Sequence, residues 1–196
     1  VKGKPEERVV SNLILRTLKV ARYEAENKGH FGIASKYYCH FTSPIRRYPD
    51  LFIHRIISKY LEENYQLKEN EIEKYSSQAV KYAERSSERE KIAQKVERDA
   101  DAIKKAEYMQ SKIGEEYEGI ISSITSFGMF VELPNTVEGL IRFDDLGNEY
   151  FIYDEEKKTL QGEKSKKIYK IGDSIKVRVI FADKLTRKVD FEKISG

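Results

Sequence analysis

The sequence has 196 residues but only one cysteine and no tryptophan. The single cysteine, Cys39, excludes an internal disulfide framework and predicts a reducing, cytoplasmic environment. No apolar run approaches the roughly 18 residues that a membrane span needs, so no membrane association is expected. Residues 1–10 lack the apolar stretch of a secretory signal peptide. Aromatic residues make up 11% of the chain, which argues against simple disorder.

The net charge of +3 conceals a strong segregation of charge along the chain. Residues 1–60 carry a net charge of +7, and residues 61–114 are close to balance. Residues 115–156 carry −10, and residues 157–196 return to +7. Such blocks can create local fields that steer a charged ligand, although runs of charge are equally often only solvated faces.

The apolar spacing is helical over the first half of the chain. Three helices are predicted, over residues 5–29, 49–61 and about 73–112. Residues 30–48 are predicted to form an irregular loop. The third helix has a narrow, alanine-rich apolar stripe, so we expect it to lie against a partner surface. Whether this stripe also lets the chain self-associate stays open.

After Gly114 the pattern changes to short β-branched and aromatic runs separated by turn residues. These runs cover residues 117–124, 129–133, 137–143, 174–182 and 188–191. Five short strands in about 80 residues predict a small closed barrel. The polar stretch at about 144–169 is too long for an ordinary turn and is predicted to be an insertion. The fold class is therefore α+β, with a helical part over 1–112 and a barrel domain over 113–193.

The segment HFTSPIRRYPDL (40–51) is the first candidate site. Arg46 and Arg47 directly precede the predicted helix at Pro49, and cations are unfavourable at this end of a helix. A bound anion would relieve that cost, because free backbone N–H groups and guanidinium forks both bind phosphate. Neighbouring hydroxyl and aromatic side chains that could assist are Phe41, Thr42, Ser43 and Tyr48. An arginine pair that bridges acidic residues elsewhere in the fold is the alternative.

The same segment, followed by His54 and Arg55, resembles the signature of the ribonuclease II/R family of 3′→5′ exoribonucleases. It is closer to the ribonuclease R branch, and the upstream stretch from GKPEE to SKYY is also similar to that branch. The resemblance implies that residues 1–112 are the C-terminal helical portion of the family's catalytic domain. It also implies a processive enzyme that hydrolyses single-stranded or structured RNA to nucleoside 5′-monophosphates.

The resemblance also implies roles for individual residues. Arg46 matches the family arginine that reaches the phosphates at the active centre, and Arg47 is assigned to catalysis with it. RNA-contacting roles are assigned to His40, Thr42, Ser43 and Tyr48. Glu97 matches a glutamate of a late-helix element of the family, so it is a further candidate for RNA contact. An ordinary solvated glutamate is an equal alternative at that position.

One feature of the family is missing from the sequence. Family members hold Mg²⁺ with a cluster of aspartates upstream of the arginine motif, and no such cluster occurs here. Asp99 and Asp101 are the closest acidic pair, but two residues apart on a helix they point in different directions. We therefore expect Mg²⁺ only in the full-length enzyme and no metal ligand here. The chain is expected to be an inactive fragment that needs the missing N-terminal part of the catalytic domain.

The second candidate site is the predicted barrel. The segments GIISSITSFGMFVEL (119–133) and EGLIRFDDL (138–146) resemble the RNA-binding domain named after ribosomal protein S-one, which has an OB fold. Phe127 and Phe130 flank a glycine turn, where one or both rings could stack on bases of single-stranded RNA and either could instead be core. Arg142 can stack on bases and pair with phosphate. Cations expected to complete a groove are Lys176, Arg178, Arg187 and Lys188.

Three functions remain open at this point. The leading hypothesis is part of a processive exoribonuclease. The first alternative is a non-catalytic module that binds single-stranded RNA. The second is an interaction protein that uses the long helix as a docking surface.

Overall fold

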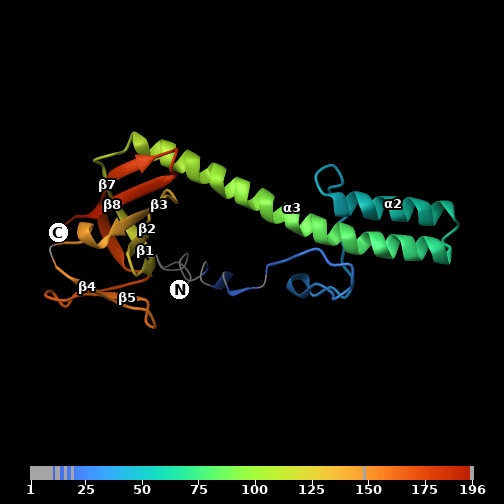
Figure 1. Cartoon of the computed structure of the whole chain (residues 1–196), viewed down its shortest axis with the longest axis horizontal. Coiled ribbons are helices and arrows are strands. Elements are labelled where there is room, and N and C mark those ends of the chain that lie inside the picture. Colours follow the sequence, from blue (N-terminus) through green and yellow to red (C-terminus); the bar gives the residue numbers. More distant parts are fainter. Residues whose placement is uncertain (1–10, 12–13, 16, 19, 148, 195–196) are drawn as a thin grey trace. The chain divides into compact units, whose positions relative to one another are not determined.

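The computed structural model describes residues 11, 14, 15, 17, 18, 20–147 and 149–194 (Figure 1). The chain divides into two compact units, and we describe each by itself. One unit is Val20–Val96, and the other is built around Glu97–Gly196. The helix α3 (Glu69–Gln110) contributes residues to both units. Within the described ranges, no helix combines the length and the apolar character of a membrane span.

The first unit is organised by aromatic packing between α2 (Tyr48–Glu62) and the first half of α3. Pro49 lies in the first turn of α2, where its missing N–H costs no hydrogen bond. The ring of Phe52 is buried and contacts the rings of Tyr75 and Tyr82 at centroid distances of 6.2 and 5.1 Å. The two helices therefore lie side by side (Figure 1). The predictions of helices over 49–61 and 73–112 are confirmed, with shifted ends.

The helix predicted over residues 5–29 is wrong in its second half. Residues 20–29 are not helical, whereas residues 11, 14, 15 and 17 are. The remaining part of the predicted helix, including Pro5, lies outside the described residues. The physical reason is visible at Tyr23, whose backbone N–H donates to the Ser87 hydroxyl at 2.9 Å. The Ser87 hydroxyl donates in turn to the Tyr23 carbonyl, so α3 supplies the partners that a helix would supply. The loop that follows contains the short 3-10 helix η1 (Phe31–Ile33).

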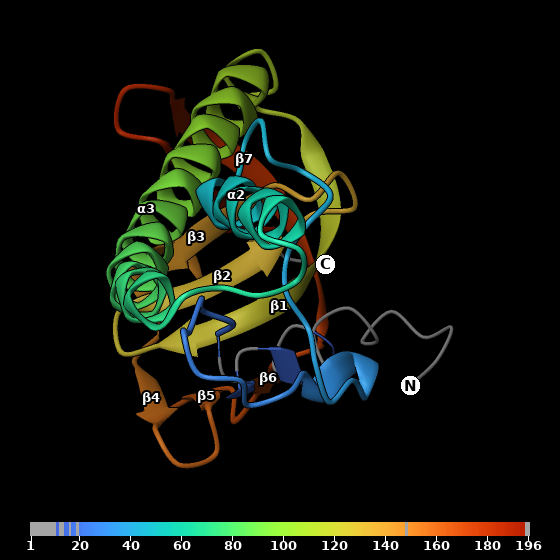
Figure 2. The same cartoon turned by 90° about the vertical axis from the view of Figure 1, so that its right-hand side faces the viewer.

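The second unit contains a closed five-stranded barrel. Its strands are β1 (Glu116–Thr125), β2 (Gly128–Glu132), β3 (Glu138–Arg142), β7 (Ser174–Asp183) and β8 (Lys188–Lys193). Their order around the barrel is β1-β2-β3-β8-β7, and they can be followed in Figures 1 and 2. Neighbours pair antiparallel except β3 and β8, which are parallel and close the barrel at Leu140 and Asp190. The predicted five-stranded barrel is confirmed.

The core of this unit lies inside the barrel and extends to the last turns of α3. Ala106 and Met109 of α3 are fully buried and belong to the same cluster as the barrel residues Ile121 and Phe191. Gly139 is required opposite Phe191, because a Cβ at this position would lie 2.4 Å from the Phe191 ring. The close approach of β3 and β8, which closes the barrel, therefore leaves no room for a side chain at position 139.

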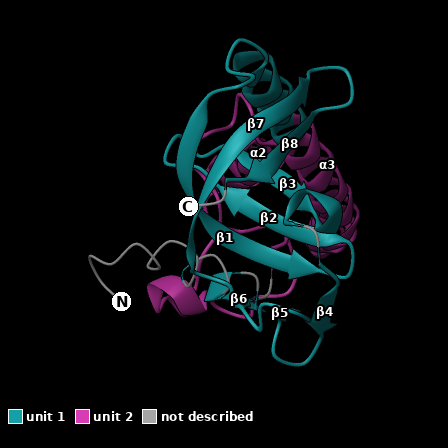
Figure 3. Cartoon of the chain, turned by 90° about the vertical axis from the view of Figure 1, so that its left-hand side faces the viewer, with its two compact units in different colours: residues 1–19, 97–196 teal, residues 20–96 magenta. Residues whose placement is uncertain are grey.

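The predicted insertion forms a small sheet of its own. After the 3-10 helix η2 (Phe143–Asp145), the chain forms an antiparallel sheet of β4 (Phe151–Asp154), β5 (Thr159–Gly162) and β6 (Ile168–Lys170) (Figure 3). The sequence pattern predicts no strands here, because each strand has only three or four residues. Phe151, Leu160 and Tyr169 are buried in the core cluster, so the inner face of this sheet packs on the barrel.

We predict that Gly139→Ala destabilises the barrel by about 1–3 kcal/mol, since the added methyl group overpacks the Phe191 ring. Urea denaturation of the two proteins measures the difference. Gly32→Ala is the control, because its added Cβ would meet the nearest atom, in the His30 ring, at an ordinary 3.4 Å. Equal stability of Gly139→Ala and the unmodified chain would contradict the packing argument.

Candidate nucleic-acid interface

The loop before α2 is held by the buried carboxylate of Asp50. Asp50 has no exposed surface, and its Oδ2 accepts hydrogen bonds from the Ser43 N–H and the Arg47 guanidinium, both at 2.8 Å. The Ser43 carbonyl accepts the N–H groups of Arg46 and Arg47 at 3.3 and 3.0 Å. Residues 43–50 therefore form one closed, cross-linked turn at the start of α2.

Electrostatics keep Asp50 ionised. Burial by itself raises the pKa of this carboxyl. The hydrogen bonds from the Ser43 N–H and the Arg47 guanidinium lower the pKa by more than burial raises it, so the pKa lies below its ordinary value. The pair is incompletely satisfied, because Asp50 Oδ1 and Arg47 Nε are buried and have no hydrogen-bond partner among the described residues. A buried polar atom without a hydrogen bond costs free energy of folding. The packing of the surrounding residues therefore has to offset this cost and hold the turn in place.

The two arginines have different surroundings. Arg47 is committed to Asp50, and its side chain is only 19% exposed. Arg46 is exposed, and among the residues that the structure describes its side chain makes no hydrogen bond or ion pair. The arrangement leaves Arg46 available to an anion and makes Arg47 a support of the loop. The role of Asp50 was not predicted, although its position three residues after Arg47 was a signal for the pair.

The other predicted residues of this site lie close to the turn. His40 is half-buried and makes edge contacts with the rings of Tyr23 and Tyr38, at centroid distances of 5.3 and 5.7 Å. Burial and the nearby Arg47 lower its pKa, which favours the neutral imidazole. Thr42 is exposed, whereas Tyr48 packs on Tyr82 at 4.8 Å.

Sequence analysis did not predict a stack of Phe41 on His54. The two rings are nearly parallel, with centroids 4.1 Å apart. His54 Nε2 also lies 2.8 Å from the Phe41 carbonyl oxygen. Phe41 is therefore held against α2, although 44% of its surface stays exposed.

The second unit has a groove of about 640 Å³ beside the barrel. The barrel and α3 residues that line it are Arg98, Asp101, Ala102, Lys105, Phe127, Phe130, Val137, Glu138, Gly139, Leu140, Arg142, Arg187, Lys188, Val189 and Asp190. Phe127 is 56% exposed, Phe130 is half-buried, and their rings meet edge to face at 6.2 Å. Arg142 is exposed, and its Nη2 lies 3.5 Å from Asp190. The groove thus offers an exposed ring beside several cations.

The structure brings some of the predicted cations together and not others. Arg187 and Lys188 line the groove, but Lys176 and Arg178 do not. Arg178 forms ion pairs with Glu116 at 2.7 Å and Glu192 at 2.9 Å. Lys176 is exposed on the same strand, opposite Glu118 of β1. The prediction that these two residues belong to the cationic groove is therefore wrong, because both lie on β7, which supplies none of the residues that line it.

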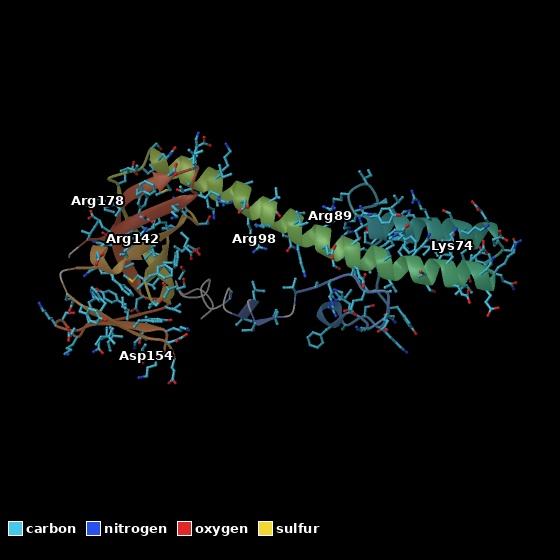
Figure 4. All side chains as sticks on the ribbon, in the orientation of Figure 1. Lys74, Arg89, Arg98, Arg142, Asp154 and Arg178 are labelled. Carbon is cyan, nitrogen blue, oxygen red and sulfur yellow. The ribbon has the colours of Figure 1, made fainter. Side chains whose placement is uncertain are left out.

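Helix α3 supplies groove residues that sequence analysis missed. Arg98, Asp101 and Lys105 line the groove from the helix side, and Arg98 and Arg142 are labelled in Figure 4. The ammonium group of Lys105 donates to the Thr136 carbonyl at 2.7 Å. Arg187 forms an ion pair of 2.7 Å with Asp99 of the helix. The spacing Arg98-Asp101-Lys105 places these residues on one face of a helix, which was the available signal. Glu97 is exposed and does not line the groove.

The described residues contain no cluster of side chains that could bind a divalent metal ion. No group of three or more His, Cys, Asp or Glu residues comes together there. Of the acidic pair singled out in the sequence, Asp99 is paired with Arg187. The residues present therefore do not fit a magnesium site.

Comparison with known proteins gives two domain matches. Residues 1–63 match the RNB domain, and residues 110–194 match the S1 RNA binding domain. Ribonuclease R 1 of Lactococcus lactis is 48% identical over 98% of this chain and 23% of its own length. Ribonuclease R of Escherichia coli is 38% identical over 100% of this chain and 25% of its own length.

Solved structures agree with these matches. RNase R of Mycoplasma genitalium, in its apo form and in complex with ribose methylated single-stranded RNA, has a TM-score of 0.89 and 35% identity. Each alignment covers 98% of this chain and 30% of that protein. The chain spans about a quarter of the length of the two curated relatives. On both domains and over nearly all of its own length, the chain is similar to proteins named ribonuclease R.

Proposed function

We propose that this chain is part of a processive 3′→5′ exoribonuclease that hydrolyses single-stranded or structured RNA to nucleoside 5′-monophosphates. The observation that carries the proposal is the exposed Arg46, whose side chain has no partner in the described part of the chain, on a turn cross-linked by Asp50 and Arg47. A guanidinium held in this way can bind a phosphate and stabilise charge that develops during cleavage. Arg47 then acts as a positioning residue, and His40, Thr42, Ser43 and Tyr48 surround the same turn.

In this proposal the barrel captures the RNA strand. A base stacks on Phe127, with Phe130 supporting the ring from its edge, and stacking of this kind tolerates any base. Arg142, Arg187 and Lys188 attract the phosphates, while Asp190 and Glu138 moderate that attraction within the groove. The RNA complex of the Mycoplasma genitalium protein supports RNA as the ligand.

The complete enzyme would need parts that the described residues do not contain. We propose that Mg²⁺ is held in the full-length enzyme by residues outside this chain, so that the chain alone does not cleave RNA. The absent part of the catalytic domain would cover exposed apolar side chains such as Phe31 and Ile45, which are both fully exposed. These side chains would otherwise favour self-association. A cytoplasmic location would agree with the single, free Cys39.

A second candidate function is a non-catalytic module that binds single-stranded RNA. The groove with its exposed Phe127 ring favours this function for the isolated chain. A salt titration of RNA binding tests it, because phosphate contacts make the affinity fall steeply with salt. No binding at low salt would leave only the role of an interaction protein.

We predict that Phe127→Ala weakens binding of single-stranded RNA about tenfold, since a stacked base contributes about 1–3 kcal/mol. Fluorescence anisotropy with a labelled oligonucleotide measures the affinity. Phe181→Ala is the matched control, because Phe181 is 44% exposed on β7 and does not line the groove. Equal losses in the two variants would exclude stacking at Phe127.

We predict that Arg46→Ala in the full-length enzyme lowers turnover about 100-fold, as loss of one charge-stabilising donor does in other enzymes. RNA affinity should fall only a few-fold, because one phosphate contact among several is lost. Single-turnover kinetics and binding to an uncleavable RNA separate the two effects. Arg89→Ala is the control, an exposed arginine of α3 (Figure 4). Unchanged turnover of Arg46→Ala would exclude the catalytic role.

We predict that Asp50→Asn destabilises the first unit by about 3 kcal/mol at neutral pH, because it leaves the Arg47 charge buried without its partner. The pKa of Asp50 is lowered in the folded state, so its stabilisation is present above the pKa of the unfolded carboxyl. It is lost as the pH falls through the folded pKa, and the difference between variant and parent should shrink there. Thermal melts at neutral and acid pH measure this, with the exposed Asp144→Asn as control. A difference independent of pH would contradict an ionised Asp50.

A further inference from the structure

The turn between β5 and β6 presents three lysines in four residues. Lys164, Lys166 and Lys167 follow Gly162 and Glu163, and all three are exposed. The turn is closed by its own backbone, since Gly162 N–H donates to the Lys167 carbonyl at 2.9 Å and Lys166 N–H donates to the Gly162 carbonyl at 3.0 Å. The lysines are therefore presented from a defined backbone.

Glu149 fixes this turn from a distant position in the sequence. Its Oε2 accepts the backbone N–H groups of Lys164 and Ser165 at 2.9 and 2.8 Å, and its Oε1 accepts the Ser165 hydroxyl at 2.6 Å. These hydrogen bonds hold the pKa of Glu149 below its usual value. Gly162 leaves the necessary room, because a Cβ there would lie 2.5 Å from Glu149 Oε1. The carboxylate is thus used for the turn, and it forms no ion pair with the lysines in the described ranges.

The turn keeps a net positive charge, because its three lysines outnumber the carboxylates of Glu163 and Glu149. Lys164 and Lys166 have no side-chain partner in the part of the chain that the structure describes. The ammonium groups of Lys167 and of Lys193 on β8 both lie over the Tyr169 ring, at 5.2 and 5.7 Å from its centre. Lys193 also interacts with Glu149 and helps to lower the pKa of that carboxyl, so Glu149 balances part of this charge.

An exposed aromatic residue adjoins the turn through its backbone. The carbonyl of Tyr150 accepts the Glu163 N–H at 2.8 Å, so Tyr150 adjoins the first residue of the turn. Its side chain is 71% exposed. Cations that track a backbone, together with a ring on which a base can stack, are what a sequence-tolerant contact to single-stranded RNA needs. None of these residues lines the groove beside the barrel.

We propose that Lys164, Lys166 and Lys167, together with Tyr150, form a second RNA-binding surface. It would take the sugar–phosphate backbone of a strand that extends beyond the groove, and Tyr150 would stack on one of its bases. The inference rests on the proposed function, in which the barrel groove binds RNA. Lysines act here as point charges on phosphates, so the surface adds affinity for longer RNA without sequence preference.

The test compares Lys164→Ala/Lys166→Ala/Lys167→Ala with the unmodified chain on two single-stranded RNAs, of about 4 and about 16 nucleotides. We expect the longer RNA to bind roughly tenfold more weakly and its salt slope to fall by about 2, for three lost phosphate contacts. Binding of the short RNA should not change, because it occupies only the groove. The control Lys74→Ala/Lys81→Ala/Lys91→Ala removes the same charge from exposed positions of α3.

The outcomes separate this inference from the proposed function. If Phe127→Ala weakens both RNAs but the triple variant weakens neither, the groove binds RNA and the second surface is excluded. Equal losses in the triple variant and its control would also exclude it, since net charge alone would then explain them. If Phe127→Ala has no effect while the triple variant weakens the longer RNA, the groove function fails and the lysine surface stands.

Glu149→Gln provides a second test with an opposite sign. Removal of a negative charge strengthens RNA binding if only net charge matters. If Glu149 holds the lysine turn, the variant loosens the turn and binds the longer RNA more weakly, with the short RNA unchanged. Tighter binding of the longer RNA would overturn the role of the fixed turn.

Discussion

Closure of the barrel between β3 and β8 is the constraint on which the second unit depends. This seam is parallel, with Leu140 opposite Asp190, and its approach is close enough that only glycine fits at position 139 against Phe191. The same two strands supply about half of the groove, including Arg142 and Asp190. The groove therefore lies along the seam that closes the core, and changes that loosen the core would also displace the cations and rings beside it.

Burial of apolar side chains also attaches the last turns of α3 to the barrel, and exposed ion pairs lie beside this contact. Ala106 and Met109 are fully buried, and removal of such apolar surface from water is the main stabilising contribution. The ion pairs of Glu107 with Lys184 and of Asp99 with Arg187 are exposed, so each contributes little energy. The rotation of the helix is therefore set by the buried face that carries Ala106 and Met109, and this rotation decides which helix residues face the groove.

Local patterns predicted the elements, whereas contacts between distant segments decided the rest. The five barrel strands follow from short β-branched runs between turns. The same reasoning placed Lys176 and Arg178 in the groove, because the cross-strand glutamates opposite them depend on register. Residues 20–29 carried a helical pattern, but Ser87 of α3 provides other partners for the backbone of Tyr23. The arginine motif was recognisable from its residues, but which arginine is committed to Asp50 was not.

The turn before α2 shows why two adjacent arginines are not equivalent. Cations near a helix N-terminus are unfavourable, and Asp50 in the first turn of α2 compensates one of them. Asp50 forms an ion pair with Arg47, but its Oδ1 is buried and has no partner among the described residues. A buried ion pair that is incompletely hydrogen-bonded is not by itself evidence of added stability. Its clear structural effect is to fix the turn from Ser43 to Asp50. A fixed turn leaves Arg46 exposed at the start of α2, where a bound anion would balance its charge.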